Sequence, residues 1–503
     1  MASVASPQGW RAGTGRTAPT AAITNLGCKV NQSEMEAAAR LLRERGVRLV
    51  NADARADLYL VNTCTVTATA DQKSRQAVRR VRRANPDAEI IVTGCSVQVD
   101  PDEYRAIDPT AHLMDNLSKD RLLDELDGLL RLPALGDHDA DGAAPLPTLS
   151  GVEIEGVTDD RTSIERTRAF VKVQDGCSFF CTYCIIPTAR GPERSLAPDV
   201  VLADVRRALD AGHREIVLTG INIGTYDGGW SERGPRGSHT RSALTLSGLV
   251  RRILDETDAE RIRLSSIEPQ HVDDDLLQIW LDSGGRCLPH FHLPLQSGDD
   301  GVLRRMGRRY DTAFYARLVA RIREAIPRVA IHGDVIVGFP TEDDAAWRRS
   351  LAFIENIRFA GIHVFRYSAR PGTPAIRMAG RVDDATRKRR SAELLEVAAH
   401  ARARFAAAHV GHQVRVLFET RLDDGRWIGH AEDHTLIAAL APGAGRDDAD
   451  LGNVIGTTLV TRVDAETPDR AVGRVLDIDR PVRRLRSPLP MLATAHAGGP
   501  DGR

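Results

Sequence analysis

The sequence predicts an α/β protein in three parts: an N-terminal α/β domain, a partial barrel of six strand–helix units and a small C-terminal β-barrel. Its 503 residues exceed one ordinary domain and suggest about three. Apolar strands alternate with helical stretches up to residue 404, which is typical of parallel sheets. Beyond that point short strands are separated only by turns, a pattern that favours a small barrel.

The N-terminal domain, residues 21–130, contains three apolar runs that predict buried strands: AAITNLG, ADLYLVNTC and AEIIVTGC. After the first run, EMEAAARLLRERG predicts a helix that stops at Gly46. Residues 1–20 form an extension that we expect to be disordered, and they lack the apolar stretch of a secretory signal. The Gly-, Pro- and Asp-rich residues 131–162 predict a linker.

The central domain, residues 163–404, contains six predicted strands: FVKVQDG, EIVLTGIN, RIRLSSIEP, HFHLPLQSG, HGDVIVGFP and GIHVFRYS. Six such units separated by helices predict an incomplete α/β barrel, with a mobile glycine-rich insertion at 227–243 and a final helix at 385–404. Residues 405–482 contain five short strands: VRVLFET, RWIGHAE, TLIAAL, NVIGTTLVTRVDA and RAVGRVLDID. The tail 483–503 is expected to be disordered.

Composition excludes several classes of protein. The net charge is -1 and the pI about 7.0, so any basic surface must be local. No run of about eighteen apolar residues occurs, which argues against a membrane-spanning helix and favours a cytoplasmic location. Seven cysteines in this length do not predict a disulfide scaffold, and a reducing compartment favours thiolate ligands or catalysis.

The strongest local motif is DGCSFFCTYCIIP, which spaces Cys177, Cys181 and Cys184 as C-x3-C-x2-C directly after the first barrel strand. Closely spaced thiolates of this kind hold iron–sulfur clusters. Three local ligands would leave one iron of a four-iron cluster open to a small chelating ligand. A zinc site is the alternative, but it requires a fourth ligand that is not adjacent.

Three further cysteines each follow a predicted N-terminal strand. Cys28, Cys64 and Cys95 are far apart in sequence, yet the carboxyl ends of parallel strands share one sheet edge, where ligands gather. They are therefore expected to converge; the alternative is that each is an ordinary buried thiol. Cys287 belongs to neither set and is expected to be a buried thiol.

The loop, with Tyr183 before its last cysteine, and the barrel that follows it resemble the radical S-adenosylmethionine enzymes. GCKVNQSE, VNTCTVTATADQKSRQ and VTGCSVQ narrow the resemblance to the methylthiotransferases, and the match extends from residue 21 to about 480. The resemblance implies S-adenosylmethionine and two [4Fe-4S] clusters as cofactors. One cluster would be held by Cys177, Cys181 and Cys184, and the other by Cys28, Cys64 and Cys95. It also implies that the C-terminal barrel is a TRAM-like domain.

Within that family, GCKVNQ resembles the MtaB-type branch, which methylthiolates C2 of N6-threonylcarbamoyl-adenosine beside the anticodon of tRNA. ADQKSRQ, HLPLQSG, RRMGRRY, DVIVGFP and SARPGTPA also resemble this branch, whereas Ser33 and the long insertion depart from it. Methylthiotransferases of isopentenyl-adenosine, usually with GCQMN, and of a ribosomal-protein aspartate, usually with GCPKN, are the alternatives within enzymes. An iron–sulfur electron carrier or RNA-binding regulator is the alternative outside them.

The resemblance also implies sites and partners. No catalytic residue is expected beyond the cluster ligands, and the partners are the tRNA anticodon loop, a flavodoxin- or ferredoxin-type electron donor and a sulfur donor. For each expected cofactor contact, strand-end packing or capping is the alternative. The contacts expected for S-adenosylmethionine are Thr219, Gly220, Asn222, Ser266, Glu268, Gln296, Ser297 and Asp334.

Local charge supports an RNA substrate. The segment KSRQAVRRVRRA is basic without an acid, and on a helix its arginines are expected to track phosphates; a merely solvated face is the alternative. The expected RNA contacts are Arg75, Arg79, Arg80, Arg82 and Arg83. Arg190, Arg194 and the run 387–390 are expected to add positive charge near the barrel. Residues 412–479 contain seven arginines and no lysine against thirteen acids, so the TRAM-like domain is expected to contribute little RNA affinity.

Overall fold

The computed structural model describes residues 19–116, 119, 167–229, 244–441, 451–479 and 493–494. The chain divides into two compact units, one of residues 1–159 with 490–503 and the other of 160–489. The predicted linker lies outside the described residues, as do most of the N-terminal extension, the insertion and the C-terminal tail. Within the described residues, no helix has both the length and the apolar character needed to cross a membrane.

The first unit is built on a parallel sheet in the order β19-β1-β3-β4-β5, with β2 also paired to β1. Its strands are β1 (Thr20–Asn25), β2 (Arg48–Val50), β3 (Leu58–Thr63), β4 (Glu89–Gly94), β5 (His112–Met114) and β19 (Ala493–Thr494). Its helices are α1 (Lys29–Glu44), α2 (Ala68–Ala84), α3 (Cys95–Val99) and α4 (Pro101–Ile107). The three predicted strands and the predicted helix are confirmed, although α1 begins earlier, directly after Cys28.

Both faces of this sheet are covered because successive side chains of a strand point to opposite sides. Ala21 and Ile23 of β1 pack with Met35 and other residues of α1 in one apolar cluster. Ala22, between them, belongs to a second cluster with Val78 and other residues of α2. The central strands are therefore buried on both faces, as their continuous apolar runs predict.

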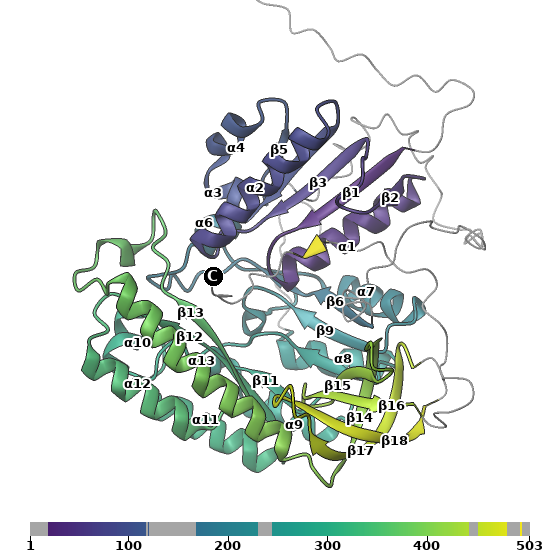
Figure 1. Cartoon of the computed structure of the whole chain (residues 1–503), viewed down its shortest axis with the longest axis vertical. Coiled ribbons are helices and arrows are strands. Elements are labelled where there is room, and N and C mark those ends of the chain that lie inside the picture. The colour runs from purple at the N-terminus through teal and green to yellow at the C-terminus, as the bar shows by residue number, and fades with distance from the viewer. Residues whose placement is uncertain are drawn as a thin grey trace, which may run out of the picture. The chain divides into compact units, whose positions relative to one another are not determined.

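The second unit begins with six parallel strands arranged as an open barrel (Figure 1). Two three-stranded sheets, β6-β9-β10 and β11-β12-β13, are joined by bridges from Ile262 to Cys287 and from Ser266 to His292. All six predicted strands are confirmed: β6 (Arg168–Lys172), β9 (Glu215–Thr219), β10 (Ile262–Leu264), β11 (His290–His292), β12 (Ala330–Val337) and β13 (Gly361–Arg366).

The helices of this unit pack their apolar sides against the barrel strands in one large core. They are α7 (Pro198–Asp210), α8 (Leu246–Glu256), α9 (Asp274–Asp282), α10 (Asp300–Met306), α11 (Thr312–Ala325), α12 (Asp344–Ile357) and α13 (Asp384–Ala407). A short antiparallel pair, β7 (Gln174–Asp175) with β8 (Arg194–Ser195), encloses the cysteine loop and the one-turn helix α6 (Ile186–Arg190).

The C-terminal strands close into the predicted β-barrel, in the order β14-β15-β16-β18-β17. They are β14 (Gln413–Arg421), β15 (Trp427–Ala431), β16 (Leu436–Leu440), β17 (Val454–Val463) and β18 (Arg470–Ile478). Their inward side chains, Val416 and Phe418 among them, form a separate small core. This barrel belongs to the same compact unit as the six-stranded one.

Buried arginines join the two barrels of the second unit. Glu215, at the start of β9, accepts from Arg261 Nε at 2.9 Å and from Arg263 Nε at 2.6 Å. Although burial alone would raise it, Arg263 and Arg261 hold the pKa of Glu215 well below its usual range. Arg261 also donates to the carbonyl oxygens of His430 and Ala431, at 3.3 and 3.4 Å. The base of the open barrel is thereby hydrogen-bonded to β15.

Candidate active site

The cysteine loop of the second unit is fixed by its backbone. Gly176, just before the first cysteine, has φ +71°, and a Cβ there would lie 1.9 Å from the carbonyl oxygen of Pro192. Only glycine fits this close approach. Cys177 N donates to the Gly191 carbonyl at 3.0 Å, and Cys184 N donates to that of Cys181 at 2.9 Å. These contacts fix the loop backbone at its first and last cysteines.

The thiols influence one another electrostatically, which places them close together. Burial, the largest effect, raises the pKa of Cys184 to about 12, and the neighbouring Cys181 and Cys177 raise it further. Burial likewise raises the pKa of Cys177. Three neighbouring thiolates in a partly buried loop are unfavourable by themselves, and a cationic iron cluster core is the kind of partner that would remove this penalty.

Two of the expected cofactor contacts lie beside this loop. Asn222, which follows β9, is buried with its Nδ2 4.0 Å from Cys177 Sγ. Its Oδ1 is buried without a hydrogen-bond partner in the described part of the chain. Buried acceptors are normally hydrogen-bonded, so this oxygen is suited to accept from a bound molecule. Glu268, which follows β10, is paired with Arg308, whose Nη1 lies 3.3 Å from Cys181 Sγ.

The remaining expected contacts lie at the carboxyl ends of neighbouring strands. Thr219 and Ser297 are fully buried, and a Cβ at Gly220 would lie 2.9 Å from a backbone oxygen. Ser266 and Gln296 take part in isolated bridges to the next strand, and Gln296 has φ +68°, a conformation that costs about 1 to 3 kcal/mol for a residue other than glycine. No bound molecule tests these contacts, so they stay predictions.

Asp334 of β12 has partners that the sequence did not indicate. His292 Nε2 and His363 Nδ1 lie 2.9 and 3.1 Å from its Oδ1. Against the effect of burial, these two imidazoles hold the pKa of Asp334 below its usual range, so it remains a carboxylate.

Arg308 is a site residue that sequence reasoning missed. Its buried guanidinium reaches Cys181, the Tyr183 hydroxyl at 3.4 Å and Glu268, while its Nε donates to the Tyr310 hydroxyl at 3.1 Å. The motif RRMGRRY was visible in the sequence, but nothing there distinguishes this arginine from its neighbours.

The cysteines of the first unit follow three adjacent strands, as predicted. Cys28 precedes α1 after β1, Cys64 follows β3, and Cys95 begins α3 directly after β4. Gly94, before the last of them, has φ +105°, and a Cβ there would lie 2.4 Å from the Thr63 carbonyl oxygen. A glycine is therefore required for β4 to turn at this point.

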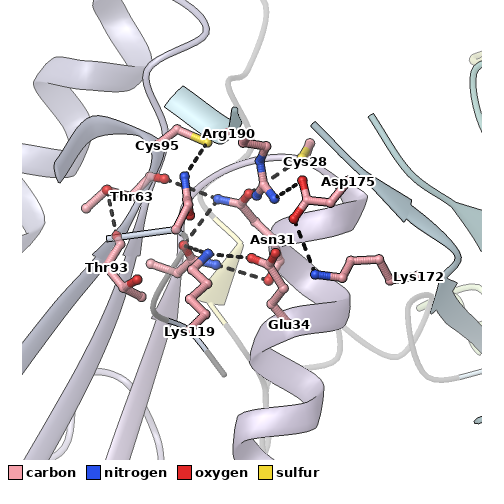
Figure 2. A network of polar contacts seen from close by, with 12 residues as sticks. Cys28, Asn31, Glu34, Thr63, Thr93, Cys95, Lys119, Lys172, Asp175 and Arg190 are labelled. Atoms are coloured by element: carbon pink, nitrogen blue, oxygen red, sulfur yellow. Dashed lines mark hydrogen bonds and ion pairs between the residues drawn. The ribbon is translucent and has the colours of Figure 1, made fainter. Parts of the chain in front are cut away.

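Asn31 ties these strand ends together (Figure 2). Its Nδ2 donates to Asn62 Oδ1 at 3.3 Å and to the Thr63 carbonyl at 3.1 Å, and its Oδ1 lies 3.6 Å from Cys28 Sγ. Asn116 Nδ2 lies 3.5 Å from Cys95 Sγ. Amide groups thus lie beside the thiols of Cys28 and Cys95, in the position of outer-shell groups of a metal–sulfur site.

Neither cysteine triplet matches a site for one ion. Among the described residues, the only group whose ligand atoms all lie within 4.8 Å of one another is His292, Asp334 and His363. Neither cysteine triplet forms so compact a group among the described residues, and the thiolates of a four-iron cluster need not, because they bind different irons.

The basic helix α2 contains arginines of two kinds. Arg79, Arg80 and Arg83 are exposed. Arg75 instead pairs with Glu103 at 3.0 Å, and Arg82 pairs with Asp108 at 2.8 Å. The expected phosphate contacts at Arg75 and Arg82 are thus already engaged by acids of their own unit.

Other arginines expected to add basic surface near the barrel also serve the fold. Arg190 is buried against Asp175 at 2.8 Å, and Arg390 is buried between Glu342 and Asp344 (Asp175 and Arg190 are labelled in Figure 2). The positive charge that these two arginines were expected to add near the barrel is therefore offset by buried or neighbouring carboxylates. Cys287 is buried, in agreement with its predicted role as a structural thiol.

Family models match both units. Residues 20–115 match the uncharacterized protein family UPF0004, and residues 171–354 match the Radical SAM superfamily. The threonylcarbamoyladenosine tRNA methylthiotransferase MtaB of Bacillus subtilis is 36% identical over 82% of this chain and 89% of its own length. The MtaB enzyme of Thermotoga maritima is 35% identical over the same shares.

The chain belongs to the MtaB-type radical S-adenosylmethionine methylthiotransferases.

Members of this family use S-adenosylmethionine and [4Fe-4S] clusters, and the two cysteine sets of this methylthiotransferase supply suitable ligands. A tRNA-2-methylthio-N(6)-dimethylallyladenosine synthase of Maricaulis maris is also similar, at 33% identity over 79% of this chain and 86% of its own. The radical S-adenosylmethionine methyltransferase TsrM from Kitasatospora setae, solved with cobalamin and a [4Fe-4S] cluster, has the same fold at 15% identity and a TM-score of 0.50, over 71% of this chain and 74% of TsrM.

Proposed function

We propose that this enzyme methylthiolates C2 of N6-threonylcarbamoyl-adenosine next to the anticodon in tRNA. The observation that supports this most strongly is the likeness to MtaB enzymes over four-fifths of the chain. The two separate cysteine sets agree with it, because radical formation and sulfur delivery are two different tasks.

The chemistry explains why this fold is used. An adenine C2–H bond is not acidic enough for ordinary proton transfer. The cluster held by Cys177, Cys181 and Cys184, together with S-adenosylmethionine, would supply the radical chemistry needed to remove that hydrogen. The base must leave its stack to reach the barrel, and this costs least in a single-stranded loop.

The residues of the chain would bind and orient these groups. Cys177, Cys181 and Cys184 would hold the radical-forming cluster, and Cys28, Cys64 and Cys95 the cluster that serves sulfur transfer. Asn222 and Glu268 would contact S-adenosylmethionine, since both lie beside the loop thiols. The other cofactor contacts would be Thr219, Gly220, Ser266, Gln296, Ser297 and, through its backbone or its carboxylate, Asp334.

The partners of the enzyme and its cellular location follow from the same proposal. Exposed Arg79, Arg80 and Arg83 of α2 would contact tRNA phosphates. A flavodoxin- or ferredoxin-type protein would supply the electrons, and a separate donor would supply the sulfur. The enzyme would act in the cytoplasm, where thiolates and tRNA are both found.

Mass spectrometry of tRNA nucleosides tests the proposal. Deleting the gene should remove 2-methylthio-N6-threonylcarbamoyl-adenosine and leave its unmethylthiolated precursor, and a plasmid copy should restore it. A copy with Cys177→Ala is the matched control and should not restore it. If the deletion instead removes only the methylthio derivative of dimethylallyl-adenosine, the substrate is the one named for the Maricaulis relative.

A further inference from the structure

The inside of the open barrel contains a polar cluster on its later strands. His292 of β11, Asp334 of β12 and His363 of β13 come from three adjacent parallel strands. Residues alternating with them, such as Val335 and Ile362, belong to the apolar core beneath the helices. Because successive strand residues point to opposite faces, the polar cluster faces the barrel interior.

One carboxylate oxygen orients both imidazoles. Asp334 Oδ1 lies 2.9 Å from His292 Nε2 and 3.1 Å from His363 Nδ1. His292 is nearly buried, at 10% side-chain exposure, whereas His363 is 58% exposed. With Nδ1 bound to Asp334, the second ring nitrogen of His363, Nε2, is the one left to meet a ligand.

This cluster adjoins the radical-forming site. Gln296 N donates to the Asp334 carbonyl at 2.7 Å, and the Asp334 carboxylate acts electrostatically on Glu268. Glu268 in turn pairs with Arg308, which lies against Cys181. A base whose C2 approaches the cofactor would therefore bring its other groups near these histidines.

An exposed aromatic side chain lies on the same strand face. Phe365 is two residues beyond His363 on β13, so both side chains project from one side, and it is 39% exposed. Exposed aromatic rings are the surfaces on which unstacked bases are held. Next to such a ring, an imidazole is placed to contact a substituent of the base.

We propose that His363, oriented by Asp334, binds the threonylcarbamoyl group of the substrate adenosine and so selects a polar over an apolar N6 substituent. The proposal rests on the proposed function and adds a residue that determines specificity. The threonylcarbamoyl group offers a carboxylate, a hydroxyl and a urea, all of which hydrogen-bond to imidazole. A dimethylallyl group would cover the imidazole without replacing its lost water contacts.

Substrate competition tests this. The holoenzyme would be given anticodon stem-loops bearing either N6-threonylcarbamoyl- or N6-dimethylallyl-adenosine, and kcat/KM measured for each. His363→Leu should lower kcat/KM for the first by about 10- to 100-fold, the value of hydrogen bonds to a charged group, and leave the second unchanged or improved. His363→Gln, which keeps a donor, should recover part of the loss.

Two controls separate this role from damage to the fold. His400→Leu, an exposed change on α13, should alter neither substrate. Phe365→Leu should lower kcat/KM for both substrates alike, since stacking does not sense the N6 group. 5′-deoxyadenosine formation without RNA should persist in all four variants.

An unchanged ratio of the two kcat/KM values in His363→Leu would overturn the inference while leaving the proposed function intact. A wild-type enzyme inactive on the threonylcarbamoyl substrate would instead overturn the proposed function. A divalent metal, present in the holoenzyme beyond its cluster iron and lost in His363→Leu, would also overturn the inference, because the three ligand atoms would then hold an ion.

Discussion

Arg308 is placed to act on the expected barrel cluster without binding iron. Its guanidinium is buried, lies 3.3 Å from Cys181 Sγ and pairs with Glu268. A positive donor beside a cluster thiolate stabilises the reduced, more negative cluster and raises its reduction potential. The same side chain fixes Glu268, so Arg308 is a positioning residue for the cofactor site.

Replacing this arginine should change the potential more than the fold. Arg308→Gln is expected to make the barrel cluster harder to reduce, measured by redox titration followed by electron paramagnetic resonance. Arg309→Gln is the control, since the Arg309 guanidinium lies over the Phe179 ring at 4.1 Å. An equal potential in both variants would mean that Arg308 only supports the loop.

At this scale, the sequence indicated the expected cluster ligands but not the side chains around them. Cysteine spacing is local, so Cys177, Cys181 and Cys184 could be read directly. Arg308 reaches Cys181 across 127 positions, and His363 reaches Asp334 across 29. Such pairings depend on which strands become neighbours, and a single sequence does not contain that information in its local pattern.

Among the elements, helix α2 has some arginines paired with acids of its own unit and others exposed to solvent. Arg82 bonds to Asp108, to the Pro86 and Ala88 carbonyls and to Thr110, whereas Arg79 and Arg83 are exposed. The basic segment was expected to lie on a helix and the apolar runs on either side of it to form strands, and the structure confirms both. The sequence pattern could not assign Arg82, because the acid that binds it lies 26 residues further along the chain.

Neutralising the exposed arginines of α2 should change RNA binding alone. Replacing Arg79, Arg80 and Arg83 by Ser should weaken tRNA binding and flatten its salt dependence by about 0.7 to 0.9 in slope per lost phosphate contact. A filter-binding salt titration measures this. Unchanged slope would show that α2 is only a solvated face.

Arg82→Ala, by contrast, should destabilise the first unit by about 1 to 3 kcal/mol, because Asp108 is left buried without its cation. Burial alone would raise the pKa of Asp108, but the hydrogen bonds from Thr110 and Arg82 lower it below its usual value. The pair therefore stabilises the unit above the ordinary aspartate pKa, and this contribution is lost as the pH falls through the lowered value. Urea unfolding of the unmodified protein and of Arg82→Ala, at neutral and at acidic pH, measures this. The difference between their free energies of unfolding should be smaller in acid.

For the whole molecule, two cysteine sets in two compact units predict two independent clusters. Anaerobic reconstitution should give about eight irons per chain. Replacing Cys177, Cys181 and Cys184 by Ala should leave about four and abolish 5′-deoxyadenosine formation. About four irons in the unmodified protein would contradict the second cluster.

The tasks of the clusters should also separate. Cys28→Ala, Cys64→Ala or Cys95→Ala should keep reductive cleavage of S-adenosylmethionine while eliminating methylthiolated product, measured by chromatography of both products. The reason is that radical formation needs only the barrel cysteines. A variant that retains its barrel cluster yet no longer cleaves the cofactor would argue against this division.

The hydrogen bonds from Arg261 to β15 also decide how this chain can be divided. A chain cut after residue 404 would open the buried Arg261–Glu215 pair to water, so we expect its thermal unfolding midpoint to fall even without RNA. Domain shuffling between relatives faces the same constraint. A foreign C-terminal barrel would have to present carbonyls where His430 and Ala431 do. We therefore expect the two barrels to be exchangeable only as one piece, although their patterns in the sequence look separable.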